Sequence, residues 1–285
     1  MKPPYRLAGF LVFVGASLCL AQRWGGEGWL PNADTIRTAR EAPSHSTGTP
    51  LWTNAPGFGK DVFTFARIRY SRAPRGSWSA GNWHTDFPDS DLNLSYRLQQ
   101  MTTIKVDPDG RVLDLTDKEL FDYPFIYIVE PGRLTFTDEE IPILRRYLLN
   151  GGFLMCDDFW GEREWRNFSE QLKKVFPERE PVDLPLDHPM FHWVFDLKER
   201  PQVPGQPNVR EQGWDGRTWE VADGKDVHYW AILDDKKRIM VMACHNNDLG
   251  DGWEREGVDE FYFREFSEKK AYPMGINIIA YAMTH

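Results

Sequence analysis

The sequence predicts a three-layer α/β domain built on a largely parallel β-sheet. Residues 123–129 and 152–156 are apolar runs that end at acidic residues, the pattern of strands buried on both faces. Between them, Ile141, Leu144 and Leu148 recur at helical spacing. A strand, a helix and a strand joined by short links make a βαβ unit, and strands continue to alternate with helices along the chain.

The βαβ unit also carries start and stop signals for its helix. Thr137 and Glu140 form a capping box where the helix begins, and Gly151 and Gly152 end it. Upstream, the predicted elements are a strand at 62–70 with alternating apolar and polar side chains, a short helix at 92–98 and a strand at 103–106. Downstream, they are a helix at 165–176, strands at 229–232 and 238–244, and a nearly all-apolar helix at 274–283.

Composition excludes several classes of protein. The 285 residues include 34 Lys and Arg against 43 Asp and Glu, a formal net charge of −9. Such an acidic chain lacks the broad basic surface that duplex nucleic acid needs, so no nucleic-acid partner is expected. With 41% hydrophobic residues and only three cysteines, the chain is neither disordered nor a disulfide scaffold.

The first residues have the plan of a secretory signal peptide. Lys2 and Arg6 precede an uncharged apolar run at 7–20, and Ala21 is a small residue at a suitable cleavage position. The run is shorter than the roughly 20 residues that span a bilayer, so cleavage is expected rather than a permanent anchor. The mature chain is then expected to lack a membrane span and to be periplasmic or extracellular.

The chain therefore divides into a signal peptide at 1–21 and two further segments. Residues 22–60 are rich in Gly, Pro, Thr and Ser and are predicted to be a flexible N-terminal arm. Residues 61–285 form the predicted α/β domain, in which about 177–225 is a Pro-rich irregular insertion.

Two cysteines remain after the predicted cleavage, and each closes an apolar run. Cys156 and Cys244 fit buried thiols packed as small hydrophobic groups. A disulfide between them is the alternative in an oxidising compartment, because the sequence does not reveal whether their Cα atoms lie within range.

Polar residues follow four of the predicted strands. In parallel α/β sheets, ligands bind beyond the carboxyl ends of the strands, where the strand order reverses. We therefore expect the residues at these positions to line one crevice. They are Arg69, Tyr70, Glu130, Asp157, Asp158, His245, Asn246, Asn247 and Asp248.

Two acidic motifs at this edge each have two readings. Asp157 and Asp158 are suited to holding a cation or to acting as an acid/base pair, but Asp158 is equally suited to capping the next helix while Asp157 accepts loop amides. The run 245–253 is rich in oxygen-bearing side chains and Gly. These side chains could bind a hard cation, or they could form Asx turns that hold the loop together. The spacing of the oxygen-bearing residues differs from that of the twelve-residue calcium loop, so the sequence does not identify metal ligands here.

The sequence also resembles a known family. Residues 147–159, Tyr-Leu-Leu-Asn-Gly-Gly-Phe-Leu-Met-Cys-Asp-Asp-Phe, are similar to the signature of the bacterial family called domain of unknown function 4159. Shorter matches lie at 65–70, Trp83 with Asp86, 91–94, 187–191, 245–253 and 274–285. The resemblance covers about 61–285 and implies a flavodoxin-like domain of the class I glutamine amidotransferase-like superfamily. It implies no established activity.

The chain departs from glutamine amidotransferases at the position of their nucleophile. Those enzymes place a reactive Cys in a tight, Gly-flanked elbow after a strand. Aligning the apolar strand puts Asp157 rather than Cys156 at the elbow, and no Gly follows. Thiol amidotransferase chemistry is therefore not expected.

Two classes of function remain. The first is a non-catalytic binding or assembly module whose crevice holds a small polar ligand or a protein partner. The second is a hydrolase-like enzyme that uses Asp157, Asp158 and His245, with or without a divalent cation. The absence of a recognisable nucleophile–base pair favours the first, and no cofactor is required by the sequence. Candidate ligand-binding residues are Arg69, Tyr70, Trp83, Asp86, Glu130, Asn246, Asp248 and Asp251.

Overall fold

A computed structural model describes residues 30, 32–58, 61–70, 83–209 and 214–285. Asn32–His285 form one compact unit, which is the subject of the following description. The predicted signal peptide at 1–21 lies outside the described residues. Within the described part of the chain, no helix has the length and apolar character needed to cross a membrane.

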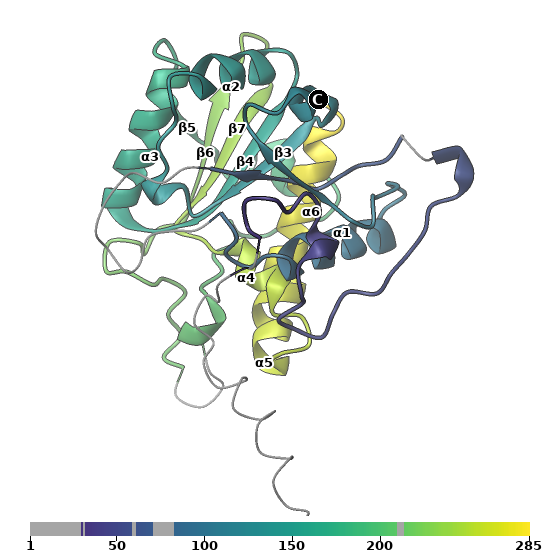
Figure 1. Ribbon diagram of the computed structural model, residues 1–285. Coiled ribbons are helices and arrows are strands. Elements are labelled where there is room, and N and C mark those ends of the chain that lie inside the picture. Colours follow the sequence, from purple (N-terminus) through teal and green to yellow (C-terminus); the bar gives the residue numbers. More distant parts are fainter. Residues whose placement is uncertain (1–29, 31, 59–60, 71–82, 210–213) are drawn as a thin grey trace, which may run out of the picture. The chain divides into compact units, whose positions relative to one another are not determined.

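Seven strands form a single, mostly parallel sheet in the order β2-β1-β3-β4-β7-β6-β5 (Figure 1). Strands β2, β1, β3, β4 and β7 pair in parallel, whereas β6 is antiparallel to both of its neighbours. This confirms the predicted α/β class and the largely parallel sheet. The strands are β1 (Ala66–Arg69), β2 (Arg111–Asp114), β3 (Phe125–Val129), β4 (Phe153–Phe159), β5 (Val182–Asp183), β6 (His228–Leu233) and β7 (Ile239–His245).

Helices lie on both faces of the sheet, with α1, α4 and α6 on one side and α2 and α3 on the other (Figure 1). The α-helices are α1 (Asp89–Met101), α2 (Glu140–Leu149), α3 (Gly161–Val175), α4 (Leu249–Glu254), α5 (Glu260–Tyr262) and α6 (Tyr272–Ala282). A π-helical segment, Phe263–Ala271, leads into α6. Short 3-10 segments are Ala39–Glu41, Pro56–Phe58, Lys118–Asp122, Pro131–Arg133, Pro189–His192 and Gln206–Asn208.

The larger core lies between the sheet and the layer of α1, α4 and α6. Leu94 of α1, Trp253 of α4 and Ile276 of α6 are fully buried in one hydrophobic cluster with Phe125 and Tyr127 of β3. Burial of each such side chain stabilises the fold by roughly 1.5–3 kcal/mol. This explains why α6 is apolar around most of its circumference.

On the other side of the sheet, the predicted capping box begins α2. The Thr137 amide donates to Glu140 Oε2 at 2.8 Å, and the Glu140 amide donates to Thr137 Oγ1 at 3.2 Å. This exchange satisfies two amides that the helix itself leaves without partners.

Two strands differ from the sequence prediction. Residues 103–106 contribute only an isolated bridge between Phe63 and Val106, and β2 follows the Asp107–Gly110 turn instead. Strand β4 does not end at Cys156 but runs to Phe159, with an irregular register against β7 between these residues. A β-bulge of this kind carries one extra residue and bends the strand.

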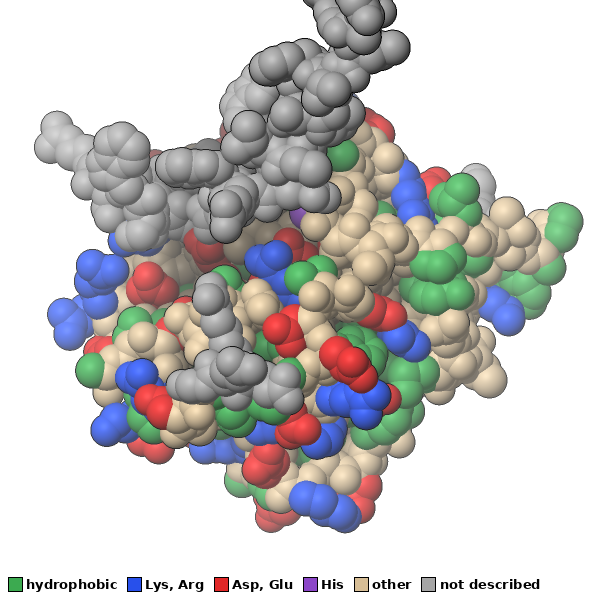
Figure 2. Space-filling model, turned by 90° about the horizontal axis from the view of Figure 1, so that it is seen from below, with side chains coloured by type: hydrophobic (Ala, Val, Ile, Leu, Met, Phe, Trp, Pro, Cys, Tyr) green, Lys and Arg blue, Asp and Glu red, His purple; other side chains and the backbone are tan. Residues whose placement is uncertain are grey.

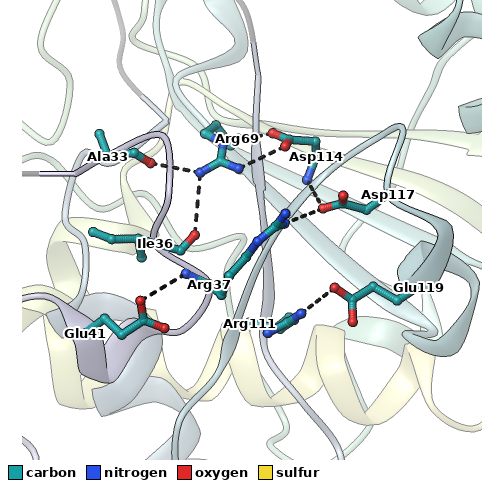
Figure 3. A network of polar contacts seen from close by, with 9 residues as sticks. All are labelled: Ala33, Ile36, Arg37, Glu41, Arg69, Arg111, Asp114, Asp117 and Glu119. Carbon is teal, nitrogen blue, oxygen red and sulfur yellow. Dashed lines mark hydrogen bonds and ion pairs between the residues drawn. The ribbon is translucent and has the colours of Figure 1, made fainter.

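The N-terminal segment is joined to the edge of the sheet rather than forming a loose arm over its described part. Arg37 Nη1 pairs with Asp117 at 2.7 Å, and Arg69 Nη1 donates to the Ala33 carbonyl at 2.8 Å (Figure 3). Arg40 donates to the carbonyls of Pro108, Thr49 and Pro50. Flexibility was predicted for 22–60 because the segment has little helical or strand periodicity. The hydrogen bonds and the ion pair described here hold a segment in place without a helix or strand, so periodicity does not reveal them.

Candidate metal centre

The crevice lies at the carboxyl edge of the sheet, where the strand order reverses between β1 and β3. Acidic side chains reach it from four chain segments. Asp86 precedes α1, Glu130 follows β3, Asp158 lies at the end of β4, and Asp248 follows β7. Seen from below the sheet, acidic side chains line a hollow in this face (Figure 2).

Two groups of three carboxylates meet in this crevice. One oxygen each from Asp86, Asp158 and Asp248 lie within 4.8 Å of one another. One oxygen each from Asp86, Asp251 and Glu254 also lie within 4.8 Å of one another and form a second group. Asp86 therefore belongs to both groups. Carboxylate oxygens are the ligands that Mg²⁺, Mn²⁺ and Ca²⁺ prefer.

Asp158 is directed into the crevice by the bulge in β4. Its backbone φ is +55°, a left-handed conformation that is uncommon for residues other than Gly. Its amide donates to the Asn247 carbonyl at 3.0 Å, and its Oδ1 accepts from Trp160 Nε1 at 3.3 Å. The side chain therefore does not cap α3, in contrast to one reading of the sequence.

Three more residues at this edge share the left-handed backbone. Asp86 has a φ of +61°, Glu130 of +45° and Asn246 of +58°. Such conformations cost free energy and concentrate at functional sites. Their grouping around the acidic crevice is a reason, independent of charge, to regard it as the functional site.

Asp248 and Asp251 are fixed by α4. Asp248 is the N-cap, and its Oδ1 accepts from the Asp251 amide at 2.8 Å. Asp251 accepts from the Gln206 amide through Oδ2 and from Arg255 Nε through Oδ1, the latter at 2.9 Å. Arg255 Nε also lies 2.8 Å from Glu254 Oε2. The second carboxylate group therefore already has one cationic neighbour.

The first group makes no such ion pair. Among the described residues, no Lys or Arg nitrogen lies within 4.0 Å of a carboxylate oxygen of Asp86, Asp158 or Asp248. Burial raises the pKa of all three carboxyls well above the usual range, and repulsion by neighbouring carboxylates raises it further, with Arg67 and Arg255 opposing the shift at Asp86. Burial likewise raises the pKa of Glu254 to about 8.

Asp157 lies beneath the crevice and points to the α4 side of the sheet. It is fully buried, and its Oδ2 accepts from the Gly250 amide at 2.8 Å. Burial raises its pKa to about 8, although backbone donors and the nearby Tyr127 hydroxyl oppose that shift. Asp157 thus accepts loop amides, as one reading of the sequence expected.

Three buried polar atoms beside Asp157 lack a hydrogen bond of good geometry. They are Asp157 Oδ1, the Tyr127 hydroxyl and Asp86 Oδ2. The absence of a side chain at Gly250 leaves room for Asp86 Oδ2 and the Tyr127 hydroxyl. A Cβ at residue 250 would overlap Asp86 Oδ2 and lie 3.0 Å from the Tyr127 hydroxyl oxygen. Unsatisfied buried groups are costly, and several together indicate that a ligand, ion or water completes the site.

Arg67 holds the loop that carries Asp86. Its fully buried guanidinium pairs with Asp91, and Nη1 donates to the carbonyls of Trp83 and Thr85 at 2.9 Å each. Sequence reasoning missed this residue and selected Arg69, two positions later. The sequence did contain an indication of this role. Asp91, the partner of Arg67, lies directly before the apolar stripe of the predicted helix, where a buried carboxylate needs a cationic partner.

Other predicted site residues serve the surrounding structure. Arg69 pairs with Asp114 at 2.8 Å, at the edge shown in Figure 3. The Tyr70 hydroxyl donates to the carbonyls of Val129 and Glu130 at 2.9 and 3.0 Å. Trp83 is buried, and Asn246 Oδ1 accepts from the Gly161 amide at 2.8 Å.

His245 lies on the face of the sheet opposite to Asp157. Its ring stacks on Phe159 and on Trp165 of α3, with centroid separations of 5.0 and 5.5 Å, and Nε2 lies 3.1 Å from the Gly161 carbonyl. The structure therefore brings Glu130, Asp157 and Asp158 to the crevice but not Arg69 or His245. It adds Tyr127 and Glu254, which sequence reasoning missed.

Both cysteines in the described part of the chain are buried free thiols. Burial raises the pKa of Cys156 and of Cys244 well above the usual range. Alignment of the apolar strand places Asp157 at the elbow position, whereas the residue with a left-handed backbone here is Asp158, one position later, beyond the bulge.

Residues 64–283 match the family model described as a domain of unknown function (DUF4159). The match confirms the family that the sequence resembles. No curated protein matches the chain.

Proposed function

The chain belongs to the DUF4159 family, and we propose that its domain binds a divalent cation through Asp86, Asp158 and Asp248 and thereby holds a small polar ligand in the crevice. One observation carries the proposal. The three carboxylates approach within 4.8 Å, and none of them makes an ion pair with a Lys or Arg among the described residues, although the more distant Arg67 and Arg255 attract Asp86. A divalent cation would compensate their charge.

A second observation is independent of the acidic cluster. Tyr127 has no exposed surface, and its hydroxyl has no hydrogen-bond partner of good geometry beside Asp86 Oδ2. A buried hydroxyl without a partner costs about 1–3 kcal/mol. Water or a ligand oxygen on the bound cation would accept its hydrogen bond.

Binding is favoured over thiol or histidine catalysis. Cys156 is buried, with a raised pKa that opposes thiolate formation, and His245 contacts α3 instead of the crevice. The hydrolase-like alternative would need a nucleophile other than these two. A water bound to the same cation is the one that this crevice could provide.

We also propose that the fold is flavodoxin-like and related to the class I glutamine amidotransferases. The parallel strands follow the order β2-β1-β3-β4-β7, which matches the flavodoxin-like order with β7 in the fifth position. We propose export as well, on the basis of Lys2, Arg6, the apolar run and Ala21.

Equilibrium dialysis of the chain from residue 22 with Mg²⁺, Ca²⁺ or Mn²⁺ tests the cation site. Wild-type protein should bind at least one of these ions and melt at a higher temperature with it. Asp158→Asn should lose that binding, whereas Glu268→Gln, which removes one exposed carboxylate, should retain it. Absence of binding by wild type at millimolar ion concentrations would refute the proposal.

A further inference from the structure

We propose that a second divalent cation binds beside the first, held by Asp86, Asp251 and Glu254, with Asp86 bridging the two ions. This inference rests on the proposed function and extends it to a two-cation centre. Paired cations in proteins are typically about 3.5–4 Å apart and share a bridging ligand.

Asp86 has the position that a bridging carboxylate requires. It is common to both three-carboxylate groups, each of which has its oxygens within 4.8 Å. Its Oδ2 is buried and makes no hydrogen bond. Its loop is held by Arg67 through the carbonyls of Trp83 and Thr85. The residue is thus positioned by its neighbours while its own carboxylate has capacity left for ions.

Asp251 and Glu254 present their carboxylates from the same side of α4. They are three residues apart, and helical residues at this spacing are neighbours on the surface. Glu254 is 6% exposed, and its carboxyl group hydrogen-bonds with that of Asp251. Its Oε2 pairs with Arg255 Nε at 2.8 Å without a hydrogen bond of good geometry. The ion-pair geometry leaves this buried oxygen with capacity for a further ligand.

Charge balance favours two ions over one. The two groups comprise five carboxylates, and Arg255 is the cation that pairs with them. When all five are ionised, four negative charges remain after Arg255 is counted, and Glu130 and Glu220 add negative charge beside Asp158 while Arg67 opposes it at Asp86. Two divalent cations compensate more of this charge than one. Uncompensated buried charge is costly, and burial together with mutual repulsion raises the pKa of Asp86 and Glu254 in the ion-free protein.

The tyrosine hydroxyl gives an observation that does not depend on the acidic cluster. Tyr127 is fully buried, and its hydroxyl lies near Asp86 Oδ2 on the side where Gly250 leaves space. The nearby Asp157 carboxylate is the described group on its side, and the two do not form a hydrogen bond of good geometry. A water or hydroxide bound by the ions that Asp86 bridges would accept the hydrogen bond of Tyr127.

Manganese titration of the chain from residue 22 tests the inference, using equilibrium dialysis and electron paramagnetic resonance. Wild type should bind two Mn²⁺ per chain and show the exchange-coupled spectrum of a close pair. Glu254→Gln should bind one ion with an uncoupled spectrum, and Asp86→Asn should bind none tightly. Glu268→Gln should match wild type.

The outcomes separate the two proposals. If wild type and Glu254→Gln both bind one uncoupled ion, the second cation is refuted and the first site stands. If wild type binds none, both proposals fail. Circular dichroism and melting of each variant verify folding, and Glu254→Asp provides a second variant that keeps the charge. It should show weakened coupling, and an unchanged spectrum would count against Glu254 as a ligand.

Discussion

Arg67 and Asp91 form an ion pair that is wholly buried beneath the loop carrying Asp86. Arg67 Nε lies 3.1 and 3.0 Å from the two Asp91 oxygens, and the side chains are 0% and 2% exposed. The same guanidinium donates to two carbonyls of the loop. The pair therefore links the position of a proposed cation ligand to the core between β1 and α1.

Arg67→Met should destabilise the domain by about 3–5 kcal/mol, because it leaves the Asp91 carboxylate buried without its partner. Urea unfolding at neutral pH measures this change. Arg67→Lys should lose less, since it keeps the charge but not the forked geometry. The double variant Arg67→Met, Asp91→Leu should recover much of the loss. A loss below about 1 kcal/mol for Arg67→Met would show that the pair does not stabilise the loop.

Gly250→Ala should weaken cation binding about 10- to 100-fold, the usual effect of disturbing groups that orient a metal ligand. The added Cβ overlaps Asp86 Oδ2 and displaces that carboxylate. Stability should change little, because Ala favours helix and the Asp86 carboxylate can move. Dialysis and thermal melting measure the two effects. Gly57→Ala is the control, since its Cβ meets nothing within 4 Å. Unchanged cation affinity in Gly250→Ala would exclude Asp86 as a ligand.

His245 should make the protein less stable in mild acid. Burial lowers its pKa to about 4, with neighbouring His228 also lowering it and with Asp183 and Asp223 opposing the shift. The unfolded chain, with a pKa near 6.5, takes up a proton that the folded chain refuses. Neutral His245 therefore contributes about 3 kcal/mol to the free energy of unfolding above pH 6.5, relative to low pH. This contribution is lost as the pH falls toward 4.

His245→Phe should flatten that loss, because Phe keeps the stack and cannot be protonated. Urea unfolding of both proteins between pH 4.5 and 7 isolates the contribution from the other titrating groups. Parallel pH profiles of the two proteins would contradict the assignment.

Cys156 and Cys244 should react slowly with iodoacetamide in the native protein and readily after denaturation. Both thiols are fully buried, and burial raises their pKa values. Mass spectrometry of the chain from residue 22 counts the labels. Cys156→Ala should reduce stability by about 1 kcal/mol or somewhat more. Rapid native labelling at neutral pH would indicate an activated thiolate and revive thiol chemistry.

The exported protein should begin near Gln22. The charged start, short apolar run and Ala21 are the features on which cleavage depends. N-terminal sequencing of protein from the cytoplasmic and extracytoplasmic fractions measures the outcome. Ala21→Arg should block the cut and leave a longer chain. Mature protein that retains Met1 in the cytoplasm would rule out export.

The sequence predicts much of the crevice because strand ends can be recognised locally. Glu130, Asp158 and Asp248 follow apolar runs, and parallel strands bring their carboxyl ends to one edge. Arg67 and Tyr127 lie within strands, where nothing local reveals that their polar atoms meet the loop before α1. Whether His245 faces α3 or α4 depends on a single residue of register, which the apolar pattern of β7 leaves open.

The bulge in β4 reverses the odd–even order of the strand's side chains. Asp157 contacts α4, yet Phe159, two residues later, packs on Phe168 of α3, on the other face. In a regular strand these two positions would share a face. A deletion of one residue here would restore the regular alternation, moving Phe159 toward α4 and removing a carboxylate from the crevice. If β4 is aligned without a gap to a regular strand of another protein, the residues beyond Cys156 are therefore matched to the wrong positions. Relatives that lack the additional residue would present a different set of cation ligands.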